Sequence, residues 1–267
     1  MKTKNYIIFF GAAGSGKAYS DHTSIVPDYY IDNDKNKWGS KLKGVEIMPP
    51  SFLTNEFIDQ IDSLVITTGY VKSVLPQLLN LGIPKNKITI PAKSLLGSHP
   101  FKSLENRIEA AEFLSILMTS NERMKVLAGG GTALGFCRDL DFIKWDFDFD
   151  LFASIKFRNE LISLLDNLGC SPLLEENEIK AAYSLKNGDI IPFSIKFFDP
   201  DKDIYIDIYE DHIWNWPIDM FSNCTSVYIH NFLVNVPNPP EKYLEGIYGK
   251  NWQIPNPDFQ YNDYGKP

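Results

Sequence analysis

The chain of 267 residues has little cysteine, no long apolar run and fewer basic than acidic side chains. Its 3 cysteines are too few and too scattered for a disulfide framework or a zinc site, so a reduced, cytoplasmic setting is expected. No segment reaches the roughly 18–20 apolar residues that cross a bilayer. The short apolar run at 6–10 continues into a glycine-rich turn, which disfavours a cleaved secretion signal.

Basic side chains number 26 against 34 acidic ones, giving a formal net charge of −8. This balance argues against a protein whose main task is to bind nucleic acid by neutralising phosphates. An anionic substrate stays compatible if a metal ion supplies positive charge locally. Apolar residues make up 44% of the chain, which is enough for folded cores.

The pattern of the chain changes around residues 91–100, where small and polar residues replace the regular alternation. Residues 1–97 alternate strand-like and helix-like segments, which predicts an α/β domain with a small doubly wound parallel sheet. Residues 98–267 predict a mixed α+β domain. The expected strands are 6–10, 29–31, 64–68 and 87–90 in the first domain, and 125–128, 147–152 and 204–209 in the second.

A glycine-rich turn follows the first expected strand. Gly11, Gly16 and Lys17 have the spacing of a phosphate-binding P-loop, but Ala18 replaces the hydroxyl residue that would hold magnesium. A second interpretation is a dinucleotide or nucleotide-sugar turn, in which backbone N–H groups at a helix N-terminus face a pyrophosphate.

In that second interpretation Gly11, Gly14 and Gly16 form the turn, and Asp32, at the end of the next strand, meets a ribose hydroxyl. The segment resembles the small Rossmann-like domains of bacterial sugar-modifying enzymes, some of which bind nucleotide sugars and some of which only dock. The alternative is a turn that needs small residues for close packing, and the sequence leaves both open.

Acidic residues alternate with aromatic ones in the segment 146–150. On an extended strand Asp146, Asp148 and Asp150 would share one face, where their mutual repulsion calls for a cation. Magnesium, which prefers carboxylate and phosphate oxygens, is the simplest choice, with manganese as a substitute. Asp146 alone is expected to be solvated.

A second acidic strand is expected at 204–209, where three isoleucines share one face and Asp207 lies on the other. If this strand paired with 147–152, Asp207 would approach Asp148 and Asp150, and the three carboxylates would suit a two-metal phosphoryl-transfer site. The glycine turn that precedes the acidic segment would bind phosphate oxygens through Gly130, Gly131 and the Thr132 hydroxyl.

Residues 131–138 (GTALGFCR) and 142–150 (FIKWDFDFD) resemble the signature of the LicD/fukutin phosphotransferases, roughly GTLLGxxR, three residues, then FIPWDDDID. Residues 206–208 resemble the third acidic strand of that family, and residues 237–255 its closing motif. Lys144, Phe147 and Asp141 depart from the family pattern, and these departures concern donor preference.

The resemblance implies a nucleotidyltransferase-like fold and an enzyme that moves a phosphorylated alcohol from a CDP-linked donor to a sugar hydroxyl of a surface glycan. Phosphocholine, ribitol phosphate and glycerol phosphate are the groups concerned. In that scheme Asp148 and Asp150 hold magnesium at the donor pyrophosphate, and Asp207 shares a second metal and acts as general base. Arg138 offsets negative charge on the pyrophosphate or on CMP.

Two other functions share these features. The same carboxylates would serve a nucleotidyltransferase that uses ATP or CTP and releases pyrophosphate. A non-catalytic nucleotide-sugar sensor would bind its ligand in the first domain alone. The expected partners are the CDP-linked donor and a sugar or glycan acceptor, without nucleic acid or a membrane span. A peripheral contact with a lipid-linked glycan at the inner membrane face is compatible. The oligomeric state and the role of His212 are left open.

Overall fold

A computed structural model describes residues 5–92, 95–97, 99–209, 212–257, 259 and 263–265. The basic start at 1–4 and residues 93, 94 and 98 of the predicted boundary lie outside this set. The chain forms two compact units, Met1–Ser98 with Pro257–Phe259 and His99–Asn256 with Gln260–Pro267. The division falls next to the boundary predicted after residue 97.

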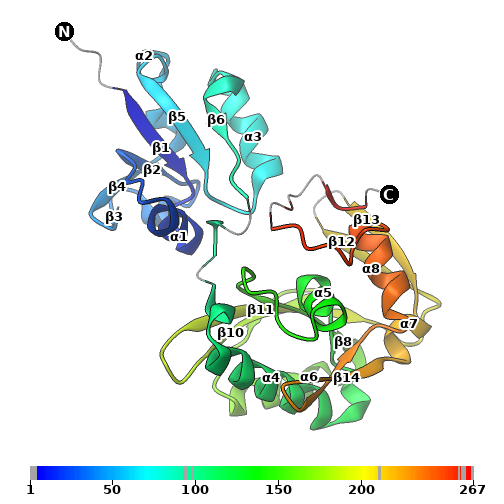
Figure 1. Cartoon of the computed structure of the whole chain (residues 1–267). Coiled ribbons are helices and arrows are strands. Elements are labelled where there is room, and N and C mark those ends of the chain that lie inside the picture. The colour runs from blue at the N-terminus through cyan, green and yellow to red at the C-terminus, as the bar shows by residue number, and fades with distance from the viewer. Residues whose placement is uncertain are drawn as a thin grey trace. The chain divides into compact units, whose positions relative to one another are not determined.

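The first unit is built on a six-stranded sheet, in the order β3-β4-β2-β1-β5-β6 (Figure 1). Neighbouring strands are parallel except β3 and β4, which form an antiparallel hairpin. The strands are β1 (Tyr6–Phe10), β2 (Tyr29–Ile31), β3 (Lys41–Leu42), β4 (Val45–Met48), β5 (Ile61–Ile66) and β6 (Ile88–Thr89), and the helices are α1 (Gly14–Thr23), α2 (Asn55–Ile58) and α3 (Val71–Asn80).

Alternation along β1 explains why this sheet is covered on both faces. Ile8 and Phe10 belong to one buried cluster, which also holds Val74 of α3, whereas Phe9 belongs to a second cluster with Tyr19 of α1. Apolar side chains on both faces are typical of a parallel sheet between two helical layers. The predicted doubly wound α/β sheet is therefore confirmed.

The second unit is built on a five-stranded sheet, in the order β7-β8-β11-β10-β9, with two separate hairpins, β12–β13 and β14–β15. Its strands are β7 (Leu127–Ala128), β8 (Phe149–Ser154), β9 (Leu173–Leu174), β10 (Glu178–Ser184), β11 (Ile190–Phe198), β12 (Ile204–Tyr209), β13 (His212–Pro217), β14 (Thr225–Ile229) and β15 (Phe232–Val236). Its helices are α4 (Leu104–Thr119), α5 (Gly130–Arg138), α6 (Arg158–Asn167), α7 (Asp219–Ser222) and α8 (Pro240–Tyr248).

Helices α4 and α6 cover one face of the five-stranded sheet, and α5 and α8 lie over the other (Figure 1). On the α4 side, Phe113 packs against Phe149 and Phe193, with ring centroids 6.2 and 5.7 Å away. On the α8 side, Tyr243 packs against Phe152 at 6.2 Å. Phe149 and Phe152 point to opposite faces, so β8 joins the two layers. The α+β class predicted for this half is confirmed.

Candidate functional site

Two glycines of the turn after β1 are required by packing. A Cβ on Gly11, whose φ is +119°, would lie 2.7 Å from the Thr67 carbonyl oxygen. A Cβ on Gly16 would lie 2.3 Å from the Gly11 carbonyl oxygen. Gly14 differs, because no atom lies within 4 Å of the place its Cβ would occupy, at the start of α1. Close packing of helix on strand thus accounts for Gly11 and Gly16.

The Asp32 carboxylate closes the same turn. It accepts hydrogen bonds from the Ala12 N–H at 2.8 Å, the Asp34 N–H at 2.9 Å and the Lys37 Nζ at 2.9 Å. Burial would raise the pKa of Asp32, but these hydrogen bonds and the Lys37 charge outweigh it and lower the pKa. Both oxygens are therefore engaged within the protein, and a ribose contact of Asp32 stays a prediction.

In the second unit, the glycine turn between β7 and α5 is bound to the start of β8. The Gly129 N–H donates to the Asp150 carbonyl oxygen at 2.7 Å, and the Asp150 N–H donates to the Thr132 hydroxyl at 3.0 Å. Thr132 is buried. Its hydroxyl thus holds the strand in place, while the amides of Gly130 and Gly131 remain at the helix N-terminus.

Two carboxylates converge on this helix N-terminus. The Gly131 N–H approaches Asp150 Oδ2 at 3.4 Å. A Cβ on Gly130, whose φ is +45°, would lie 2.2 Å from Asp150 Oδ2, and a Cβ on Gly131 would lie 2.5 Å from Asp146 Oδ2. Asp146, expected to be merely solvated, is half-buried against the turn. The two glycines therefore form a cradle between Asp146 and Asp150.

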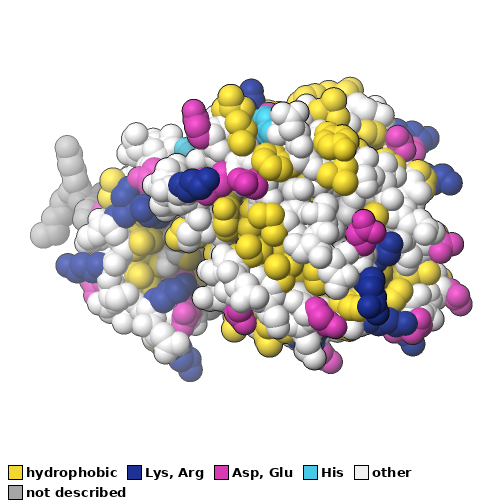
Figure 2. Space-filling model, turned by 90° about the horizontal axis from the view of Figure 1, so that it is seen from below, with side chains coloured by type: hydrophobic (Ala, Val, Ile, Leu, Met, Phe, Trp, Pro, Cys, Tyr) yellow, Lys and Arg dark blue, Asp and Glu magenta, His cyan; other side chains and the backbone are white. Residues whose placement is uncertain are grey.

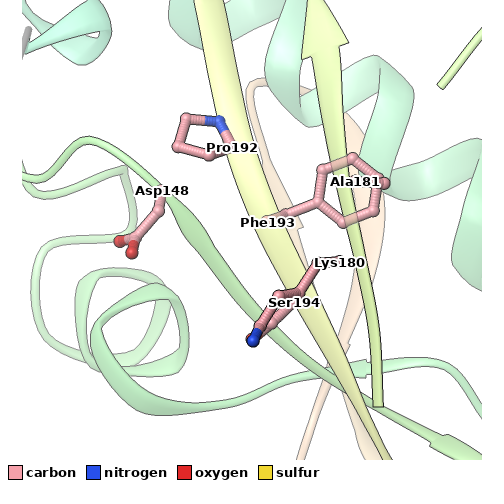
Figure 3. Close-up of a pocket in the computed structure, with 6 residues that line it drawn as sticks. All are labelled: Asp148, Lys180, Ala181, Pro192, Phe193 and Ser194. Atoms are coloured by element: carbon pink, nitrogen blue, oxygen red, sulfur yellow. The ribbon is translucent and has the colours of Figure 1, made fainter. Parts of the chain in front are cut away.

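The three aspartates do not share one strand face, so that prediction is wrong. Strand β8 begins at Phe149, and Asp146 and Asp148 belong to the loop before it, where the Asp146 N–H donates to the Ile143 carbonyl oxygen at 2.9 Å. The turn that begins at Ile143 keeps residues 146–148 out of the extended strand that the alternating acidic and aromatic residues predicted. Asp148 instead lines a cavity beside the sheet (Figure 3).

The predicted pairing of strand 204–209 with 147–152 is also wrong. β12 pairs with β13, and the neighbours of β8 are β7 and β11. Asp207 is 5% exposed, and its carboxylate accepts a hydrogen bond from Lys196 Nζ at 2.7 Å. Over the part of the chain that the structure describes, no three His, Cys, Asp or Glu side chains form a metal-binding group. The charge that balances Asp207 is therefore a lysine.

Tyr243 is a site residue that the sequence did not reveal. Its hydroxyl accepts a hydrogen bond from the Gly130 N–H at 2.9 Å, and the side chain is buried. Burial, then the negative charges of Asp207 and Asp150, raise the pKa of Tyr243 well above its ordinary value. Helix α8 therefore fixes the glycine turn through a neutral hydroxyl. The resemblance of residues 237–255 to the closing motif of the LicD/fukutin family included Tyr243, but it did not predict the hydrogen bond to Gly130.

Arg138 lies at the wrong end of its helix for the predicted role. It is the last residue of α5, about 12 Å from Gly130 along the axis at about 1.5 Å per residue. Its guanidinium makes two hydrogen bonds to the Asp139 carboxylate, at 2.8 and 2.7 Å. The expected contact of Arg138 with a donor phosphate is therefore corrected. His212 is half-buried and stacks on Trp214 with ring centroids 5.5 Å apart.

Of the three aspartates expected to bind metal, Asp148 and Asp150 are the two that would hold a single magnesium ion. Magnesium in phosphate-binding sites is held by one or two carboxylates, and substrate phosphates supply further oxygens. Asp148 and Asp150 offer such oxygens, and the Gly131 N–H, whose contact to Asp150 Oδ2 is long at 3.4 Å, lies at the helix N-terminus where a phosphate oxygen would bind. Asp207, which is bonded to Lys196, is not part of this set.

Two further features are the distribution of charge on the surface and the length and hydrophobicity of the helices. On the face shown in Figure 2, basic and acidic side chains are interspersed among apolar and neutral ones. None of the helices in the described ranges is both long and apolar enough to cross a bilayer.

No protein-family model and no curated protein matches the chain. The lincomycin-bound crystal structure of the lincosamide antibiotic adenylyltransferase LnuA is 9% identical over 49% of this chain and 80% of that chain, with a TM-score of 0.34. UDP-D-quinovosamine 4-dehydrogenase from Vibrio fischeri is 18% identical over 33% of this chain and 75% of that chain, with a TM-score of 0.25. UDP-N-acetylglucosamine 3-dehydrogenase GnnA from Acidithiobacillus ferrooxidans is 12% identical over 86% and 82%, with a TM-score of 0.23. All three TM-scores lie below 0.5.

Proposed function

We propose that the second unit is a phosphotransferase of the LicD type. It moves a phosphorylated alcohol from a CDP-linked donor to a sugar hydroxyl and releases CMP. The observation that carries this proposal is the cradle at the start of α5, where Gly130 and Gly131 face the carboxylates of Asp150 and Asp146. The resemblance of residues 131–138 and 142–150 to the LicD/fukutin signature supports it.

Binding of the donor pyrophosphate is assigned to the N-terminus of α5. Backbone N–H groups and the positive end of the helix dipole bind phosphate oxygens there without any basic side chain. Phosphate would displace the weak 3.4 Å contact between the Gly131 N–H and Asp150. The Tyr243 hydroxyl holds the Gly130 amide, so the turn keeps its geometry when phosphate arrives.

Asp148 and Asp150 would hold the magnesium ion, which when bound offsets the charge of the pyrophosphate. In the reaction, an acceptor hydroxyl oxygen forms a bond to the phosphorus that carries the alcohol. The bond from that phosphorus to the CMP oxygen breaks, and CMP leaves with the electron pair. The proton of the acceptor hydroxyl passes to one carboxylate of the site. Asp207 is not assigned as the base, because its carboxylate is bonded to Lys196.

The test follows CMP release from CDP-glycerol, CDP-ribitol and CDP-choline with magnesium and a panel of glycan acceptors. Asp150→Asn keeps the shape of the side chain but removes its charge, and we expect at least a 100-fold fall in turnover, on the order of losing one key charge-stabilising group. Asp166→Asn, on the exposed surface of α6, is the matched control and should leave turnover unchanged. Normal turnover by Asp150→Asn would overturn the proposal.

The two other functions give different products in the same assay. A nucleotidyltransferase would release pyrophosphate from ATP or CTP. A sensor would bind a nucleotide sugar through residues 1–98 and turn over nothing. In the first unit, Asp32 is already engaged by Ala12 and Lys37, so that unit supplies no specific observation in favour of the sensor.

A further inference from the structure

A cavity of about 220 Å³ opens beside the proposed transfer site, between the loop before β8 and strands β10 and β11 (Figure 3). It is lined by Asp148, Lys180, Ala181, Pro192, Phe193 and Ser194. The volume is far above the roughly 10–15 Å³ that one water needs. The cavity therefore has room for a chemical group next to the carboxylate assigned to magnesium.

A row of polar side chains connects this cavity with Asp150. In the sheet register, Ser194 of β11 lies beside Asp150 of β8 on one side and Lys180 of β10 on the other. Residues directly opposite one another on paired strands share a face, and adjacent strands lie about 4.8 Å apart. A carboxylate, a hydroxyl and an ammonium group thus follow one another across the sheet, over about 10 Å.

Lys180 is held at the wall of the cavity. Its ammonium group lies 2.8 Å from Glu175 Oε1 and 3.0 Å from Glu178 Oε1. These two carboxylates raise the pKa of Lys180, so the group stays charged at neutral pH. An ammonium group carries three N–H donors, which leaves one for a ligand after these two ion pairs.

The lining suits hydroxyl groups and does not suit a quaternary ammonium group. A hydroxyl both donates and accepts, so it can pair with the Asp148 carboxylate, the Ser194 hydroxyl or the Lys180 ammonium. A trimethylammonium group makes no such bonds and is typically recognised by several aromatic faces. Among the residues that the structure describes, Phe193 is the one aromatic residue of the lining, and its ring packs in the core against Phe113 at 5.7 Å.

We propose that this cavity binds the hydroxyl groups of a polyol, so that the transferred alcohol is of the glycerol or ribitol type rather than choline. The inference rests on the proposed function. The same chemistry has a second source, since the hydroxyls of an acceptor sugar would make the same bonds. The experiment therefore separates donor from acceptor.

The first measurement is kcat/KM for CDP-ribitol, CDP-glycerol and CDP-choline in the wild type, Ser194→Ala and Lys180→Met proteins. We expect the polyol donors to exceed CDP-choline at least about tenfold in the wild type, as hydrogen bonds to a charged group typically supply. Each substitution should remove most of that advantage, because it lowers kcat/KM for the polyol donors more than kcat/KM for CDP-choline. Lys186→Met, at an exposed position outside the lining, is the control.

The second measurement does not depend on turnover. Binding of CDP-ribitol, CDP-choline, free ribitol and the acceptor sugar is measured by calorimetry and ligand-observed NMR on the same variants. Weaker binding of CDP-ribitol and ribitol in Ser194→Ala and Lys180→Met would support the donor as the source. Weaker binding of the acceptor sugar alone would support the cavity chemistry with the acceptor as its source, and would overturn the donor preference.

Failure of this inference and failure of the proposed function look different. If kcat/KM for CDP-choline equals that for the polyol donors, or if the variants lower turnover of every donor equally, the cavity proposal is overturned and the transferase stands. If no donor is turned over but ribitol binds and loses affinity in Ser194→Ala, the transferase and the transferred alcohol are overturned, and only the binding of polyol hydroxyls by the cavity stands. If none of the hydroxylated ligands binds, the cavity proposal is overturned.

Discussion

The cradle at Gly130 gives the sharpest prediction, because one added methyl group should displace a carboxylate that the proposed function needs. In Gly130→Ala the Cβ would lie 2.2 Å from Asp150 Oδ2 and 2.9 Å from Asp150 Cγ, at a φ of +45°. The left-handed backbone costs alanine about 1–2 kcal/mol. The carboxylate can rotate away at a further cost of about 0.5–1.5 kcal/mol. The expected loss of stability is therefore about 1.5–3.5 kcal/mol, the sum of these two ranges.

Function should suffer even where the protein stays folded, because the displaced group is a proposed magnesium ligand. We expect at least a 100-fold loss of CMP release, equivalent to about 2.7 kcal/mol in the barrier. Gly188→Ala is the matched control: Gly188 also has a positive φ, of +89°, but no atom lies within 4 Å of its Cβ position. Urea unfolding and CMP release are measured on both variants. Wild-type turnover by Gly130→Ala, or an equal loss in Gly188→Ala, would refute the reasoning.

Three further predictions concern other buried groups. Lys196→Met leaves the buried Asp207 carboxylate without its ion-pair partner and should lower the free energy of unfolding in urea by about 3–5 kcal/mol. The double variant with Asp207→Asn should recover much of this loss. Additive losses in the double variant would contradict the prediction. The lowered pKa of Asp32 stabilises the fold above the ordinary carboxyl pKa of about 3.9, and this contribution disappears as the pH falls through the folded-state value, so the stability gap between wild type and Asp32→Asn should close in acid. Burial raises the pKa of Cys137 and Cys170 to about 11, so thiol reagents at pH 8 should label them slowly in the folded protein and fast in urea; rapid labelling of folded protein would count against their burial.

Sequence patterns predicted the bounds of the strands better than the pairing between strands. The expected strand at 204–209 has the bounds of β12. Alternation tells which side chains share a face, but it does not tell which strand lies alongside. Pairing with the next segment, His212–Pro217, closes a short loop and costs less chain entropy than a return to β8.

The same limit explains the candidate site. Gly130, Gly131 and Asp150 could be expected in one phosphate-binding site, because the glycine turn precedes the acidic segment with one short helix and a loop between them. Asp146 could not, because its position depends on the path of the loop at 139–148, which follows no period. Lys196 and Tyr243 were missed for another reason: each contacts its partner across the fold, and neither has a neighbouring motif that signals the contact.

Strand β12 also affects how the protein behaves once its side chains are changed. Ile204, Ile206 and Ile208 are 54–56% exposed, while Asp207 faces inward between two tyrosines in the sequence IYIDIY. Short segments rich in β-branched and aromatic residues and free of proline self-associate unless a charge interrupts them. We therefore expect Asp207 to oppose self-association of this strand if the hairpin opens. Asp207→Asn should form insoluble assemblies faster than the wild type on heating. The turnover of this variant should therefore be divided by the concentration of monomer that remains in solution.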